Sequence, residues 1–216
     1  NTPAPGVGQF RNVAISNIVA TGCERTGSSI VGLPDHLIEN VTLSSINLTY
    51  VGGVAAAQIP AEIPEKPDSY PEHNMFGTLP TYGFYCRHVD GLTLRDVAVR
   101  FDKPDQRPAL VFDDVRNVAV SGLRAQGTGG TQATIAMKAV SRALISGCVA
   151  PPEAPVFAWM DKGCERISVI GNDLSEAVRP FGFAEPSLAS CLFESANRTG
   201  RAAVTSAPAA TAPAKR

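Results

Sequence analysis

Hydrophobic and polar positions alternate in a nine-residue segment that occurs six times along the chain. The clearest copy begins at Ile38 and reads IENVTLSSI. Its fourth and sixth positions are apolar and the residues between them are polar or small, which is the period of two of a strand with one buried face. The third residues of the copies are spaced by 28, 51, 26, 25 and 24 residues, at Asn12, Asn40, Gly91, Asn117, Arg142 and Arg166.

A repeat period near 25 residues predicts a solenoid, in which each unit buries its apolar face against its neighbours. Position eight holds small residues that tolerate a tight or left-handed bend, namely Asn17, Ser45, Asp96, Gly122, Gly147 and Gly171. Position nine is apolar again in five of the six copies. Each unit is therefore expected to form a strand, a one-residue corner and a second strand. Units of this kind stack at about 4.8 Å as a parallel β-helix.

A leucine-rich repeat is the main alternative, because it shares the apolar spacing. It requires Asn or Cys at position nine, and only the last two copies, with Cys148 and Asn172, meet that requirement. No amphipathic helix of useful length lies between the copies. The sequence therefore predicts an all-β fold, a right-handed parallel β-helix with coils of about 25 residues.

The repeat also predicts how the chain is divided. We expect one elongated domain with a long loop insertion and a cap at its C-terminal end. The tail is rich in Ala and Pro, a composition typical of disorder. The expected parts are an N-terminal loop at 1–9, the β-helix at 10–174, its insertion at 51–81, the cap at 175–204 and the disordered tail at 205–216.

Charge and cysteine usage exclude several classes of partner. The net charge is -1 and no basic run is present, so we expect no nucleic-acid partner. No apolar stretch approaches the roughly 20 residues of a membrane span, so we expect no membrane partner. Cys148 and Cys164 fall in core columns and are expected to be buried hydrophobes, with a disulfide or a metal site as alternatives. Clustered Asp for calcium is absent, so neither a metal nor a cofactor is predicted.

The insertion and the strand that follows it carry the residues that are best suited to bind a ligand. Long loops on a rigid scaffold usually hold binding groups. An Arg side chain pairs with a carboxylate and an aromatic ring stacks on a sugar. The candidates for contact with an acidic sugar are Tyr82, Arg87, His88, Arg107 and His73. Alternatively, every second residue of 82–88 belongs to the core and the others form a solvated face.

Asp113 and Asp114 form the only adjacent pair of carboxylates. Paired carboxylates could act as acid and base in glycoside hydrolysis. Neighbouring strand residues point to opposite faces, however, and the pair lies where a strand enters a turn, a place where Asp is common. We therefore interpret Asp113 and Asp114 as turn residues and not as a catalytic pair. No catalytic residue is assigned.

Four segments of the chain resemble a known family. They read GQFRNVAISNIVATG from Gly8, SSIVGLPDHLIENVTLSSINLTYVGG from Ser28, YPEHNMFGTLPTYGFYCRHVDGLTLRDV from Tyr70 and RPALVFDDVRNV from Arg107. They are similar to bacterial members of glycoside hydrolase family 28, the polygalacturonase-like and rhamnogalacturonase-like proteins. The resemblance implies a right-handed parallel β-helix, hydrolysis of pectic glycosidic bonds in an acidic polysaccharide or oligosaccharide, and a secreted or periplasmic location.

The hallmark motifs of that family are absent from this chain. They are N-T-D, a D-D pair after Gly or Gln, G-H-G and R-I-K, and in family order they would precede Phe10. We therefore expect the C-terminal β-helix portion of a pectin-type hydrolase, with catalytic motifs upstream. A non-catalytic carbohydrate-binding or structural β-helix module is the alternative. A β-helix lyase is a third, and it would need a base and usually calcium, for which the sequence offers few residues.

Overall fold

The computed structural model describes residues 8–129 and 132–200. Almost all of its regular structure is β-strand, and two short 3-10 helices, η1 (Ala56–Gln58) and η2 (Pro186–Cys191), accompany the strands. The strands are β1 (Arg11–Cys23), β2 (Ser28–Val31), β3 (Ile38–Gly52), β4 (Phe84–Lys103), β5 (Leu110–Ser121), β6 (Arg124–Ala125), β7 (Ala133–Ser146), β8 (Val156–Met160), β9 (Glu165–Ile170), β10 (Asp173–Leu174), β11 (Phe181–Phe183), β12 (Leu192–Ser195) and β13 (Arg198–Thr199).

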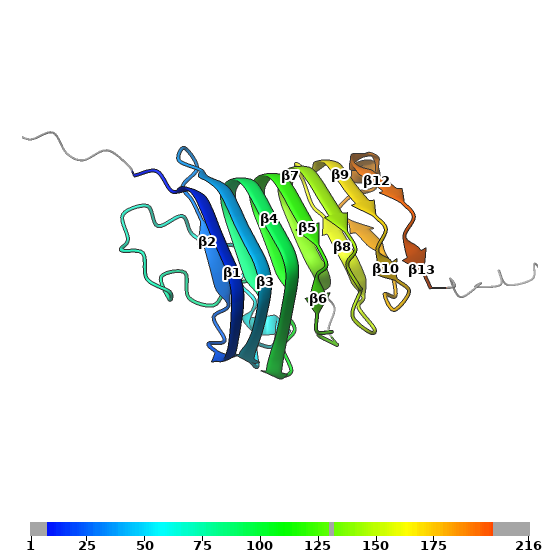
Figure 1. The fold of residues 1–216 in the computed structure, drawn as a ribbon, viewed down its shortest axis with the longest axis horizontal. Helices are drawn as coiled ribbons and strands as arrows, with labels where there is room; N and C mark the ends of the chain where they lie inside the picture. Colours follow the sequence, from blue (N-terminus) through cyan, green and yellow to red (C-terminus); the bar gives the residue numbers. More distant parts are fainter. Residues whose placement is uncertain (1–7, 130–131, 201–216) are drawn as a thin grey trace, which may run out of the picture.

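Parallel pairing between successive coils builds the molecule. The strands β1, β3, β4, β5 and β7 pair in that order, and every pair is parallel. Figure 1 shows the coils stacked in chain order from the blue β1 to the orange β13. The stack has about seven turns of roughly 26 residues. These findings confirm the parallel β-helix that the repeat predicts.

The apolar columns of the repeat form the core. In each copy from Ile38 onward the residues at positions four and six are buried, and they are Val41, Leu43, Leu92, Leu94, Val118, Val120, Ala143, Ile145, Ile167 and Val169. The first copy differs, because among residues 8–129 and 132–200 β1 pairs only with β3 and no other coil lies on its other side. Ile15, at position six, is consequently 45% exposed.

Residues in the left-handed region turn the chain at each corner. All six residues at position eight have φ between 53° and 67°, which confirms the predicted bend. Position three forms a second corner, with φ between 53° and 82° in all six copies. A third corner precedes position one, at His88, Asp114, Ala139 and Gly163. The strand segments before this third corner form the side of the solenoid on which the insertion lies.

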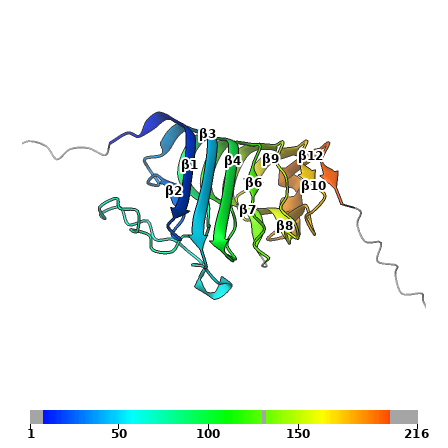
Figure 2. The same ribbon diagram turned by 60° about the horizontal axis from the view of Figure 1, so that its bottom comes forward.

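The boundaries of the parts differ from those expected. The connection between β3 and β4 occupies residues 53–83, and Figure 2 shows it extending outward beside β2 and β3. The solenoid also continues past Leu174, where a cap was expected, because β11 pairs with β8 and β12 pairs with β9, both parallel. Residues 1–7 of the expected N-terminal loop and the whole expected tail at 205–216 lie outside the described residues.

All five cysteines lie in the described part of the chain, and none forms a disulfide. Cys148 and Cys164 are buried in the core, which confirms their expected place, and Cys86 is buried as well. Burial raises the pKa of the Cys148 and Cys164 thiols, so both remain protonated near neutral pH. In the described residues, no helix is both long and apolar enough to cross a membrane.

Candidate functional site

The strand segments that precede the third corner form a parallel sheet, and its outer face carries the candidate site. These segments are β2, β8, β11 and the first residues of β4, β5 and β7. Tyr85 is in register with Val111, and Arg87 is in register with Asp113. Because alternate residues point to opposite faces, residues in register form columns on the outer face.

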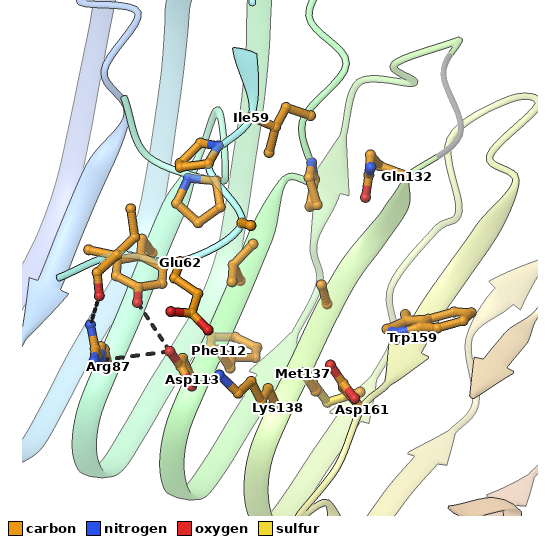
Figure 3. Close-up of a pocket in the computed structure, with 18 of the residues that line it drawn as sticks. Ile59, Glu62, Arg87, Phe112, Asp113, Gln132, Met137, Lys138, Trp159 and Asp161 are labelled. Carbon is orange, nitrogen blue, oxygen red and sulfur yellow. Dashed lines mark hydrogen bonds and ion pairs between the residues drawn. The ribbon is translucent and has the colours of Figure 1, made fainter. Parts of the chain in front are cut away.

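Two outward columns follow from this register. One column is largely apolar and contains Tyr85, Val111, Ala136, Trp159 and Gly182. The other is charged with alternating sign and contains Arg87, Asp113, Lys138 and Asp161. Figure 3 shows this charged column as a row of side chains that crosses successive coils.

The insertion covers part of this face and encloses a cavity of about 560 Å³. That volume lies within the range of about 300–1,000 Å³ that is usual for ligand sites. Ile59, Glu62 and Ile63 form the wall that the insertion supplies, and Glu62 points from it toward the sheet (Figure 3). The small side chains of Val111 and Ala136 lie on the floor and leave the space open between Tyr85 and Trp159.

Trp159 forms one end of the cavity floor. Its side chain is half-buried, and the residue in register with it on the next coil is Gly182. The glycine contributes no side chain, and the indole occupies the space next to it, since a Cβ at residue 182 would lie 2.6 Å from Cε3 of the ring. The half-buried indole thus packs on the neighbouring strand and also lines the cavity.

Asp113 lies between two cations and a phenol. Its Oδ2 atom is 3.7 Å from Nε of Arg87, and its Oδ1 atom is 3.8 Å from Nζ of Lys138. The hydroxyl group of Tyr85 donates a hydrogen bond of 3.3 Å to Oδ2. Burial and the charge of Asp113 raise the pKa of Tyr85, so the phenol keeps the proton that it donates.

Glu65 attaches the insertion to the solenoid. Its carboxylate pairs with the guanidinium of Arg87 and lies 3.1 Å from Nε2 of His88. Nδ1 of His88 is 2.7 Å from Asp114, and Nη1 of Arg87 donates a 2.6 Å hydrogen bond to the carbonyl of Ile63. Arg87 and His88, two of the predicted sugar contacts, therefore hold the loop that forms the cavity wall.

Two other predicted sugar contacts require correction, because Tyr82 and Arg107 are fully buried. Tyr82 packs in the core and its hydroxyl group donates to the carbonyl of Gln126 at 3.0 Å. Arg107 forms a buried ion pair with Asp105 and donates to the carbonyl of Arg25. Neither side chain can reach a ligand on the surface, because neither has any exposed area.

His73 lies apart from the cavity. It is exposed, and its Nε2 atom is 3.5 Å from Glu24. It lines a different hollow, of about 700 Å³, beside β1 and β2 at the end of the described part of the solenoid. That hollow exposes side chains of the core columns such as Val13 and Ile15. Arg87 is thus the one predicted sugar contact that lines the cavity itself.

The two adjacent carboxylates, Asp113 and Asp114, lie in different structural positions. Asp114 has a φ of 55° and forms the corner, as the turn interpretation predicts. Asp113 directly precedes this corner, at the end of the strand segment, and it also lines the cavity. Trp159, Lys138 and Asp161 also line the cavity but were not among the residues predicted from the sequence. Their common signal is an outward place in the segment before the third corner.

Comparisons with models of protein families, with curated proteins and with solved structures find no match for this chain. Of the resemblance to glycoside hydrolase family 28, the structure supports the parallel β-helix. Among the described residues, no group of three or more His, Cys, Asp or Glu side chains could hold a metal ion.

Proposed function

We propose that the protein binds a glycan in the cavity between the insertion and the outer face of the sheet. The observation that carries this proposal is the position of Trp159 on the cavity floor, above a glycine. A pyranose ring has a flat face of C–H groups that packs on an aromatic ring, and aromatic side chains bury large areas in binding sites. A half-buried indole that lines the cavity is suited to this contact.

Polar groups around the indole suit the hydroxyl groups of a sugar. Asp113, Asp161 and Glu62 supply carboxylate oxygens, which accept hydrogen bonds. Lys138 and Gln132 supply donors. Hydrogen bonds that involve a charged partner are roughly twice as strong as neutral ones, so a few such groups are enough to orient a sugar.

The columns also give the site a direction. Residues in one column repeat once per coil, at a spacing of about 4.8 Å. A chain molecule that lies along the columns meets an outward side chain from each coil in turn. The floor from Tyr85 to Trp159 spans four coils, so it can accommodate several units of an oligosaccharide.

The test is binding of a panel of soluble neutral and acidic oligosaccharides, measured by isothermal titration calorimetry. The variant Trp159→Ala should weaken binding by about ten-fold or more, because it removes the stacking surface. Phe193→Ala is the matched control, since Phe193 is 61% exposed on β12 and does not line the cavity. Binding that is unaffected by Trp159→Ala, or no binding to any member of the panel, would overturn the proposal.

Hydrolysis is the second candidate function, in line with the pectin-type hydrolase expected from the family resemblance. The observation that favours it is the presence of Asp113 and Asp161 in one outward column, two coils apart. This places their Cα atoms roughly 10 Å apart. Inverting glycosidases hold their acid and base carboxyl groups about 6.5–9.5 Å apart, so side chains that lean toward each other would fall within that range.

Release of new reducing ends from the oligosaccharide that binds best tests this second function. Asp113→Asn and Asp161→Asn should each abolish product formation but only weaken binding, because the amide oxygen of Asn still accepts a hydrogen bond from the sugar. If the unaltered protein binds the oligosaccharide but releases no product, hydrolysis is excluded and the protein is a glycan-binding module. A product with an unsaturated sugar would indicate a lyase instead.

A further inference from the structure

Negative charge exceeds positive charge around the cavity. Its lining contains three carboxylates, from Glu62, Asp113 and Asp161, and two cations, from Arg87 and Lys138. Glu65 does not line this cavity but the neighbouring hollow that contains His73, and from there its carboxylate forms an ion pair with Arg87. Three negative charges therefore face two positive charges in the lining, and Glu65 neutralises one of those two, that of Arg87, from outside it.

Arg87 has little capacity left for a ligand. Its side chain is only 12% exposed, and its guanidinium contacts Glu65, the carbonyl of Ile63 and Asp113. A carboxylate on a ligand would have to displace Glu65 to form the bidentate pair that Arg favours. That displacement would also break the contact between Glu65 and His88, which helps to hold the cavity wall.

Lys138 is the more accessible cation, with 56% of its side chain exposed. Its neighbours in the charged column are both acidic, Asp113 on one side and Asp161 on the other, each about 4.8 Å away along the sheet. A ligand carboxylate that pairs with Lys138 is consequently repelled by two aspartates at close range. The ligand gains one favourable pair and incurs two unfavourable ones.

From this arrangement we infer that the cavity selects neutral glycans over glycans that carry carboxylates, and that Glu65 is the residue that sets this selectivity. The inference rests on the glycan-binding function proposed above. The acidic ligand implied by the family resemblance would suit a cavity in which Arg87 is free. Here Glu65 occupies the guanidinium, and the remaining carboxylates accept hydrogen bonds from neutral hydroxyl groups.

Two matched pairs of oligosaccharides test the inference by calorimetry. One pair is an oligogalacturonide and its fully methyl-esterified form, and the other is a β-1,4-linked oligoglucuronate and the glucose oligomer of equal length. Within a pair the sugars differ only in the charge or oxidation at C6. The neutral member of each pair should bind at least about ten-fold more tightly than its acidic counterpart. Added salt should reduce that ratio, because it screens the repulsion.

The variant Glu65→Gln provides the decisive comparison. Glutamine keeps an oxygen that can accept from Arg87 and His88, but it removes the charge and leaves the guanidinium unneutralised. The affinity ratio between neutral and acidic members should fall several-fold, mainly because the acidic member binds better. Glu72→Gln is the control, since Glu72 is an exposed residue of the same insertion outside the cavity and the substitution removes the same charge.

The outcomes separate the two proposals. Tighter binding of the acidic members, or an equal change of the ratio in both variants, would overturn the inference and leave glycan binding intact. If none of the four oligosaccharides and no member of the wider panel binds, both the proposed glycan binding and the inference are overturned.

Discussion

Gly182 leaves the space that the indole ring of Trp159 occupies. A Cβ atom at residue 182 would lie 2.6 Å from Cε3 and 3.0 Å from Cζ3 of that ring. Real Cβ atoms do not approach other heavy atoms so closely, so any larger residue at 182 forces the indole to move. The orientation of the proposed stacking surface therefore depends on a residue of the next coil.

The first prediction uses this dependence. Gly182→Ala should weaken glycan binding several-fold while the protein remains folded, because the added methyl group displaces the indole from the floor. Trp159 is the only tryptophan of the chain, so its fluorescence reports both the displacement and ligand binding. Gly8→Ala is the control, because no atom lies within 4 Å of a Cβ at that position. Unchanged fluorescence and affinity in Gly182→Ala would contradict this packing.

The second prediction concerns the buried pair of Asp105 and Arg107. Both side chains are fully buried, and Arg107 also donates to the carbonyls of Arg25 and Leu79. Asp105→Ala leaves an uncompensated buried charge and should lower the free energy of unfolding by about 3–5 kcal/mol. Urea denaturation measures the loss.

A double variant and an exposed pair serve as controls for this measurement. Asp105→Ala combined with Arg107→Met removes both charges and should recover much of the lost stability. Glu165→Ala breaks the exposed pair with Arg166 and should leave the unfolding midpoint unchanged. Equal effects of the buried and the exposed substitution would show that the buried pair has no special role.

The third prediction concerns the corner at Ala139. Its φ is 52°, a conformation that costs an L-residue with a Cβ roughly 1–2 kcal/mol and costs glycine little. Ala139→Gly should therefore raise the free energy of unfolding by about 0.5–1 kcal/mol after the greater flexibility of glycine in the unfolded chain is subtracted. The same substitution at Ala98, inside β4, should lower it by about 0.5–1 kcal/mol. A decrease at both positions would argue against strain at the corner.

The fourth prediction concerns alkaline pH. Burial raises the pKa of Tyr50 to about 12, and it also raises the pKa of Tyr82 and Tyr85. In the unfolded chain these phenols lose their protons near pH 10. Above that pH the folded state binds more protons than the unfolded state, so stability falls as the pH rises from about 10 to 12. Below pH 10 these phenols are protonated in both states and add no pH dependence.

Urea unfolding across this pH range, together with the ultraviolet absorbance of phenolate, checks the fourth prediction. In Tyr50→Phe the loss of stability per pH unit should be smaller by about 1.4 kcal/mol, since one phenol no longer contributes. Ionisation of all the tyrosines near pH 10 in the folded protein would contradict the prediction.

The fold could be predicted because the repeat places the same residue types at the same structural positions. Val41 and Leu92 occupy one core column, and Ser45 and Asp96 both adopt the left-handed conformation at position eight. The last coil was harder to recognise. Glu194 is in register with Val169, so a charged residue interrupts the apolar column, and it is tolerated because its side chain is exposed at the end of the stack.

The candidate site could be predicted only in part. The charged column has a sequence signal, since Arg87, Asp113 and Lys138 each precede position one of a copy by two residues. Asp161 breaks this spacing, because its coil has one more residue before Cys164. The path of the insertion gave no signal at all. It depends on ion pairs such as that of Glu65 with Arg87, between residues that no periodic pattern connects.

The stacking of coils also determines how the cavity floor could change in length. Residues 115–139 form one complete repeat, from position one of a copy to the residue before the next. An in-frame duplication of this segment would add one side chain to every column, both inside and outside, and preserve the alternation of the strands. The floor would lengthen by about 4.8 Å, the spacing of one strand. In such a protein the length of the binding surface changes by whole coils, through duplication or deletion of a repeat. Its chemistry changes through single substitutions.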